Sequence, residues 1–217
     1  MLIIASGEKP HYFHAREDSP SDHLVVAETW SENVYQIHEK DFFDSKVFVD
    51  VGANIGAVSV YAASLNPDIK VIAVEPEPHN RDLLVRNIVK NGVEKQVKVF
   101  PLIIHSPSSE GSSWKVNDGH GNSQISQEGV AAEVVSLSTL FDRAGLDQVD
   151  VLKVDIEGAE FAALQDVAAL NRVKYLTLEF DGGRPEFGDL VTTLAHWGSL
   201  HILGSPQRGG YIYGRRY

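Results

Sequence analysis

The stretch VFVDVGANIGAVSVY, residues 47–61, joins an apolar segment to a pair of closely spaced glycines and a second apolar segment. Its first part is rich in β-branched residues, which is typical of a buried strand. The segment GAVSVYAASL, residues 56–65, has the character of a helix that faces a sheet, and Asn-Pro-Asp at 66–68 stops it. We therefore predict a strand, a glycine turn and a helix, which is the opening unit of an α/β fold.

The glycine turn carries an acid where a dinucleotide-binding turn has none. A dinucleotide turn reads G-x-G-x-x-G and holds a pyrophosphate at the N-terminus of the helix that follows. Here Asp50 precedes Gly52, Asn54 and Gly56. An acid directed into a pyrophosphate pocket would be repulsive, whereas a ligand with a cationic sulfonium and no phosphate would suit it. The pattern indicates S-adenosylmethionine, and the alternative is that Asp50 only caps the turn.

A second acid stands at the end of the next apolar segment. The strand predicted over residues 70–76 ends in Glu75 and Pro76. An acid in this place accepts hydrogen bonds from both hydroxyls of a ribose. NAD-dependent enzymes use the same contact, so Glu75 indicates a ribose and does not distinguish the two cofactors. The alternative for Glu75 is a solvent-facing strand end.

Strand and helix patterns alternate along the rest of the chain. This spacing predicts an α/β fold with a mostly parallel, doubly wound sheet and helices on both faces. An antiparallel hairpin over 200–216 closes the chain. The polar stretch 105–129 is predicted to be a loop. Further strands are predicted over 97–104, 134–136, 149–155 and 175–181, and helices over 79–92, 159–170 and 189–198.

Composition limits the classes of function. The chain has 217 residues, a formal net charge of −11 and no cysteine. The negative charge makes a nucleic-acid substrate unfavourable, and the missing cysteines exclude disulfides and thiolate chemistry. No apolar run approaches the roughly 18 residues of a membrane span, and the N-terminus does not resemble a signal peptide. A cytoplasmic protein without membrane attachment is the expectation, and its oligomeric state is left open.

Three stretches together resemble the FkbM-type S-adenosylmethionine-dependent methyltransferases. They are VFVDVGANIGAVSVYAA (47–63), VIAVEPEPHNRDLLVRNIVKNG (71–92) and VVSLSTLFDRAGLDQVDVLKVDIEGAE (134–160), and GHGNSQI (119–125) resembles the family's polar loop. The last long stretch, which runs into DIEGAE, is the most specific. The resemblance implies a class I methyltransferase fold with a seven-stranded, Rossmann-like sheet. It also implies methyl transfer, typically to an oxygen.

The resemblance also implies roles for individual positions. Residues 1–40 would be an N-terminal extension that caps the substrate side, and residues 41–217 the methyltransferase domain, in a single-domain chain. The residues implied in cofactor binding are Asp50, Gly52, Asn54 and Gly56 at the methionine end, Glu75 with Pro76 at the ribose, and His105 and Ser106 near the adenine.

Candidate catalytic groups lie at the ends of later strands. Asp155 ends a buried strand, on the edge where such sheets bind ligands, and Glu157 follows it. Either acid would serve as the base or orient the acceptor. Glu160 shares a face with Glu157 if a helix starts at once, and its alternative role is to favour the helix N-terminus. His120, in the polar loop, is a third candidate base. Asp155 with Asp181 is compatible with Mg²⁺, but nothing in the spacing requires a metal, and none is predicted.

Several functions remain open from the sequence alone. We expect O-methylation of a hydroxyl on a small molecule or glycan. Methylation of a nucleic acid or protein is the alternative within the same class. A dinucleotide-dependent oxidoreductase is disfavoured by Asp50 and by the missing third glycine. A binding module without activity is disfavoured by the intact Asp50, Glu75 and DIEGAE.

Overall fold

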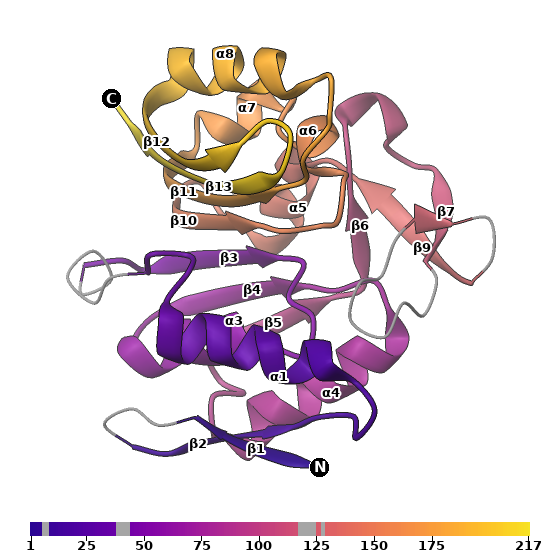
Figure 1. The fold of residues 1–217 in the computed structure, drawn as a ribbon, viewed down its shortest axis with the longest axis vertical. Coiled ribbons are helices and arrows are strands. Elements are labelled where there is room, and N and C mark those ends of the chain that lie inside the picture. Colours follow the sequence, from indigo (N-terminus) through magenta and orange to yellow (C-terminus); the bar gives the residue numbers. More distant parts are fainter. Residues whose placement is uncertain (6–8, 38–43, 117–124, 127–128) are drawn as a thin grey trace.

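A computed structural model describes residues 1–5, 9–37, 44–116, 125–126 and 129–217. Its centre is a seven-stranded sheet with the order β12-β13-β11-β10-β3-β4-β5 (Figure 1). In this sheet β11, β10, β3, β4 and β5 pair with one another in parallel, whereas β13 is antiparallel to both β11 and β12. The strands are β3 (Val47–Val51), β4 (Lys70–Val74), β5 (Val97–Phe100), β10 (Val149–Val154), β11 (Val173–Phe180), β12 (Gly198–Ser205) and β13 (Gly209–Arg216). The predicted sheet and its terminal hairpin are confirmed.

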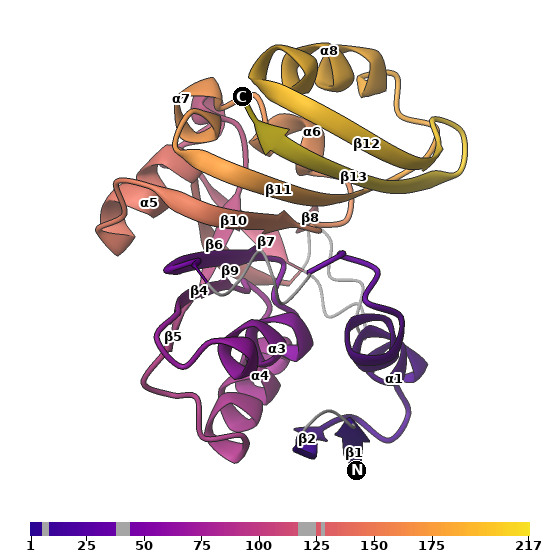
Figure 2. The same cartoon turned by 90° about the vertical axis from the view of Figure 1, so that its left-hand side faces the viewer.

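Helices cover both faces of this sheet (Figures 1 and 2). Because side chains alternate along a strand, Phe48 packs in the core beside α3 and α4, whereas Val49 packs in the core beside α5 and α8. Among the described residues, no helix is long and apolar enough to span a membrane. The helices are α1 (Pro20–Ala27), α3 (Ala57–Leu65) and α4 (Pro78–Lys90) on one face, and α5 (Leu137–Ala144), α6 (Glu160–Ala163), α7 (Val167–Leu170) and α8 (Phe187–Trp197) on the other.

The predicted strand over 97–104 is divided at Pro101. Proline has no N–H group to continue a strand ladder, and β6 (Leu102–Ile104) leaves the main sheet to pair with β9 (Val130–Val135). A second sheet of order β6-β9-β7-β8 results, with β7 (Ser113–Val116) and β8 (Ile125–Ser126). The prediction of a loop over 105–129 is therefore wrong for residues 113–116 and 125–126, and η2 (Pro107–Ser109) adds a helical turn.

The predicted helix over 159–170 is also divided. Helix α6 ends at Ala163, and Asp166 caps a new helix, α7, by accepting a hydrogen bond from Ala169 N at 3.0 Å. Asp166 also accepts one from Ser138 N, at 2.8 Å. The cap thus joins α7 to the start of α5, which a continuous helix would not allow.

The N-terminal residues pack on the α3–α4 face. Strands β1 (Leu2–Ala5) and β2 (His11–His14) form a hairpin, and α1 continues into the π-helical turn η1 (Glu28–Glu32) (Figure 2). Asn87 of α4 and Asn91, directly after the end of α4, hold the backbone of β2. Their side chains accept from His14 N at 2.6 Å and from Tyr12 N at 2.9 Å, and donate to the carbonyls of the same residues. The boundary at residue 40 remains a prediction.

Candidate active site

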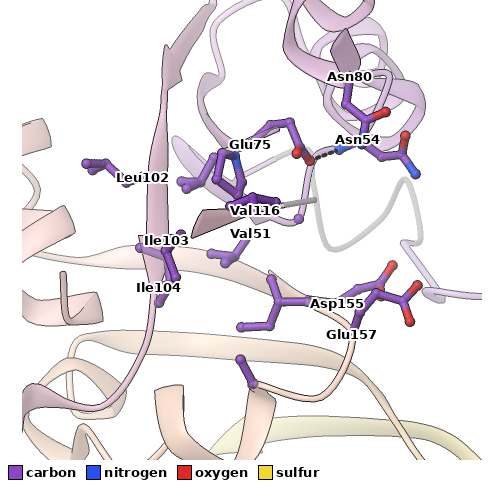
Figure 3. A pocket seen from close by; sticks show the side chains of 15 residues that line it. Val51, Asn54, Glu75, Asn80, Leu102, Ile103, Ile104, Val116, Asp155 and Glu157 are labelled. Carbon is purple, nitrogen blue, oxygen red and sulfur yellow. Dashed lines mark hydrogen bonds between the residues drawn. The ribbon is translucent and has the colours of Figure 1, made fainter. Parts of the chain in front are cut away.

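A cleft opens where β3, β4 and β10 end (Figure 3). Ligands of open α/β sheets bind at this carboxyl edge. An apolar wall of Ile103, Ile104 and Val116 faces the strand ends. Six of the residues predicted for the site line this cleft, namely Gly52, Asn54, Glu75, Pro76, Asp155 and Glu157.

The glycine turn brings β3 and β10 into close approach. Gly52 has φ +80°, and a Cβ there would lie 1.7 Å from the carbonyl oxygen of Asp155. The amides of Gly52 and Ala53 both donate to Val74 O, each at 3.0 Å. Asn54 also has a positive φ, +49°. A side chain at Gly52 would therefore force the two strand ends apart at the mouth of the cleft.

Glu75 presents its carboxylate to the cleft from the end of β4. Its two oxygens accept hydrogen bonds from Asn54 N and Glu77 N, both at 2.9 Å (Figure 3 shows the first). Burial raises the pKa of Glu75 to about 7. Each carboxylate oxygen has a further lone pair, so the group can accept two more hydrogen bonds from neighbouring hydroxyls.

Lys153, which sequence reasoning missed, lies buried beneath the cleft. Its ammonium donates to Gly52 O at 2.7 Å and lies 3.3 Å from Asp50 Oδ1 and 3.4 Å from Asp155 Oδ2. Burial alone lowers the pKa of the ammonium, but Asp155 and Asp50 outweigh that effect and raise it. The available signal was a lysine inside the apolar strand VDVLKV. Lys153 thus connects the glycine turn to the catalytic candidate Asp155.

Acidic and phenolic side chains surround Asp155 on the side toward β11. The hydroxyl of Tyr35 donates to Asp155 Oδ2 at 2.8 Å and lies 3.5 Å from Glu179 Oε2. Burial, with the charge of Asp155, raises the pKa of Glu157 to about 7 and that of Glu179 to about 8. Within the described ranges, no three His, Asp or Glu side chains are grouped to hold a metal ion.

Residues 50–206 match the family model of the methyltransferase FkbM domain. The chain belongs to this FkbM methyltransferase family. The methyltransferase sdnD of Sordaria araneosa is 28% identical over 207 residues, which cover 77% of this chain and 79% of that protein. The O-methyltransferase imqG of Aspergillus flavus is 33% identical over 52 residues, 24% of this chain and 21% of that protein. A precorrin-6y C5,15-methyltransferase structure from Geobacter metallireducens shares the fold, with TM-score 0.55 and 16% identity over 94% of each chain.

Two residues of the FkbM glycine motif lie outside the cleft lining. Asp50 is fully buried, and its Oδ2 accepts a hydrogen bond from Ser59 Oγ at 2.6 Å. Gly56, with φ +90°, directly precedes α3, and a Cβ there would lie 2.6 Å from Leu84 Cδ1 of α4. In this geometry Asp50 binds Lys153 and the start of α3, and Gly56 lets two helices approach. Cofactor contact by these two residues stays a prediction.

The residues predicted near the adenine lie just beyond the cleft lining. His105 follows β6, packs edge-on against Trp114 at 4.6 Å between ring centroids, and lies 3.0 Å from Ser109 Oγ through Nδ1. Ser106 is buried and bonds to Ser108 at 2.8 Å. The neighbouring Ile103 and Ile104 do line the cleft. His120 lies outside the described residues.

No helix starts directly after Asp155, which was the condition for Glu157 and Glu160 to share a face. Glu157 has φ +54°, and helix α6 begins only at Glu160. Glu160 accepts hydrogen bonds from Ile156 N and Gly158 N, both at 3.0 Å, so its carboxylate closes the turn. Glu157 and Glu160 therefore do not share a helical face, and only Glu157 lines the cleft.

Proposed function

We propose that this FkbM-family chain transfers a methyl group from S-adenosylmethionine to a hydroxyl of a small molecule or glycan. The observation that carries the proposal is the Glu75 carboxylate, held by Asn54 N and Glu77 N at the end of β4 with acceptor capacity left for a ribose. The bound cofactor would supply an electrophilic methyl on a sulfonium. Gly52 and Asn54 would adjoin its methionine end, and Ile103 and Ile104 its adenine.

The chemistry of the cleft lining favours this ligand over a dinucleotide. A pyrophosphate is commonly held by cationic side chains or by a helix N-terminus. Among the described residues that line the cleft, none is a lysine or an arginine, whereas Glu75, Asp155 and Glu157 are acids. A sulfonium cation gains from that arrangement, and a pyrophosphate does not.

Asp155 is our candidate for the base. A hydroxyl that accepts a methyl group must lose its proton, and a positioned carboxylate contributes typically 10²–10⁴-fold. Asp155 lines the cleft, next to the glycine turn, with its Oδ2 3.4 Å from Lys153 Nζ. The relative imqG, an O-methyltransferase by name, supports a hydroxyl acceptor. Methylation of a nucleic acid is disfavoured by the net charge of −11.

Ligand-induced thermal stabilisation tests the cofactor. We expect S-adenosylmethionine and S-adenosylhomocysteine each to raise the Tm, because a ligand at 100 times its Kd adds about 2.7 kcal/mol to the free energy of unfolding. NAD is expected to leave the Tm unchanged. Differential scanning fluorimetry measures all three. A shift with NAD and with neither adenosyl ligand would overturn the proposal.

Replacement of Glu75 tests the ribose contact. Glu75→Gln is expected to weaken S-adenosylhomocysteine binding at least about tenfold, because hydrogen bonds to charged groups contribute about 1.5–3 kcal/mol. Since the pKa of Glu75 is raised to about 7 and hydroxyls donate to the ionised form, wild-type affinity should increase from pH 6 to pH 8. Titration calorimetry measures both effects. The exposed Glu94→Gln is the control, and a pH dependence that persists in Glu75→Gln would contradict the assignment.

A further inference from the structure

The hydroxyl of Tyr35 joins two carboxylates that come from neighbouring strands. It donates to Asp155, directly after β10, at 2.8 Å and lies 3.5 Å from Glu179 of β11. The Tyr35 side chain is buried, with 6% exposed, and Lys153 Nζ lies 5.2 Å from its ring centroid. A phenol oxygen can donate one hydrogen bond and accept others. The phenol oxygen therefore lies between two carboxylates, hydrogen-bonded to Asp155 and at the outer limit of hydrogen-bond distance from Glu179.

The loop that carries Tyr35 is fixed by its own hydrogen bonds. Asn33 and Gln36 both have left-handed backbone, with φ +47° and +48°. The Asn33 side chain accepts from Ile37 N at 3.0 Å and donates to Ile37 O at 3.1 Å, and the Tyr213 hydroxyl donates to Val34 O. Left-handed backbone at residues other than glycine is strained and often found at functional sites. The loop thus holds the hydroxyl in a defined place beside Asp155.

The surroundings of this chain are mostly acidic. Coulombic repulsion from Asp155, Glu28 and Glu157 reinforces burial in raising the pKa of Glu179 to about 8, and Lys153 opposes it. The titratable groups that interact with Tyr35 or Glu179 are Glu28 of η1, Lys153, Asp155 and Glu157 at the end of β10, and Tyr211 and Tyr213 of β13. Glu32 and Asp181 add negative charge beside Glu28 and Glu157, respectively. An additional positive charge in the cleft would therefore favour loss of a proton from Glu179.

We propose that Asp155, Tyr35 and Glu179 form a proton relay, in which Tyr35 and Glu179 are positioning residues that carry the acceptor's proton away from Asp155. The relay rests on the proposed function. When the acceptor oxygen bonds to the methyl carbon, the electron pair of the cleaved S–C bond stays with sulfur and the acceptor proton moves to Asp155. Tyr35 accepts that proton and passes its own to Glu179, which is partly exposed to solvent.

The proton affinity of Glu179 at the end of the relay depends on the positive charge of the cofactor. A sulfonium in the cleft lowers the proton affinity of Glu179 and leaves it ready to accept a proton. After transfer the sulfur is neutral, so Glu179 regains its affinity and keeps the acceptor's proton until it exchanges with solvent. S-adenosylmethionine and S-adenosylhomocysteine differ only by the transferred methyl group and its positive charge, so contacts to the ribose and adenine cancel between them.

Proton release on ligand binding tests the relay without an acceptor. Titration calorimetry at pH 7.5, in two buffers with different enthalpies of ionisation, counts the protons released with each ligand. A carboxyl with a pKa of about 8 that falls by one unit would release about half a proton more with S-adenosylmethionine than with S-adenosylhomocysteine. This difference should fall by that amount in Glu179→Gln and shrink in Tyr35→Phe; Glu157, which lines the cleft and has a pKa of about 7, supplies any remaining difference. Tyr175→Phe, on the same strand as Glu179, should keep it.

The outcomes separate the relay from the cofactor assignment. Equal proton release with both ligands in the wild-type protein would overturn the relay. So would a difference that persists unchanged in Glu179→Gln and Tyr35→Phe. Binding of neither ligand would instead refute the proposed function. Circular dichroism verifies folding, and if Tyr35→Phe does not fold, Glu179→Gln decides alone.

Discussion

Replacing Lys153 with methionine is expected to lower the free energy of unfolding by about 3–5 kcal/mol. The ammonium is buried between Asp50, 3.3 Å away, and Asp155, 3.4 Å away. Removing one partner of a buried ion pair leaves the other charge without compensation, and here Asp50 is fully buried. The loss should also abolish adenosyl-ligand binding, because Lys153 Nζ holds the Gly52 carbonyl at 2.7 Å.

Urea denaturation measures this loss, and two further variants show its cause. Lys98→Met removes an exposed lysine from β5 and should change stability by less than about 0.5 kcal/mol. Adding Asp50→Asn to Lys153→Met removes the uncompensated charge and should restore part of the stability. A loss below about 1 kcal/mol in the free energy of unfolding of Lys153→Met would show that the ammonium is not needed to compensate the buried carboxylates of Asp50 and Asp155.

The sequence identified the parts of the site that lie in short, local patterns. Gly52, Asn54 and Glu75 each stand within a few residues of a strand end, and the carboxyl ends of parallel strands meet at one edge. Their convergence in the cleft follows from the sheet topology alone. Asp155 was predictable for the same reason, since it directly follows the buried strand β10.

The face of the sheet to which the Asp50 side chain points could not be predicted from the motif. Side chains alternate along β3, so Asp50 faces the same side of the sheet as its register partner Lys153 on β10. An acid and a lysine on neighbouring strands can be recognised as an ion pair only when the pairing register of the strands is known. The register is a property of the folded sheet. Asp50 and Lys153 are more than a hundred positions apart in the sequence, and no sequence pattern indicates that their side chains are in contact.

Tyr35 was unpredictable for a related reason. It lies in an irregular loop between η1 and the first strand of the main sheet, where no periodicity indicates which side chains are buried. Its contact with Asp155 joins residues 120 positions apart. The division of the predicted strand at Pro101 and of the predicted helix at Asp166 could have been predicted, because each of these residue types is a known signal for the end of an element. Proline ends a strand ladder and Asp is a preferred helix cap, but continuous apolar runs around them favoured longer elements.

Replacing Gly52 with alanine is expected to be more damaging than any other glycine-to-alanine change near the cleft. The position has φ +80°, which a side chain rarely adopts, and the new Cβ would lie 1.7 Å from the Asp155 carbonyl oxygen. Because that oxygen belongs to the backbone, β3 and β10 must separate to relieve the overlap. We expect a loss of at least about 3 kcal/mol, which combines overpacking with the cost of left-handed backbone.

Gly92→Ala is the matched control for this prediction. Gly92 has φ +70°, close to that of Gly52, but an added Cβ would meet nothing within 4 Å. Alanine at Gly92 should therefore cost about 1 kcal/mol from backbone strain alone and leave S-adenosylhomocysteine binding intact, whereas alanine at Gly52 should abolish binding. Urea denaturation and titration calorimetry on both variants isolate the effect of close approach. Equal losses of stability would mean that contact between the glycine turn and the Asp155 backbone does not hold the cleft in shape.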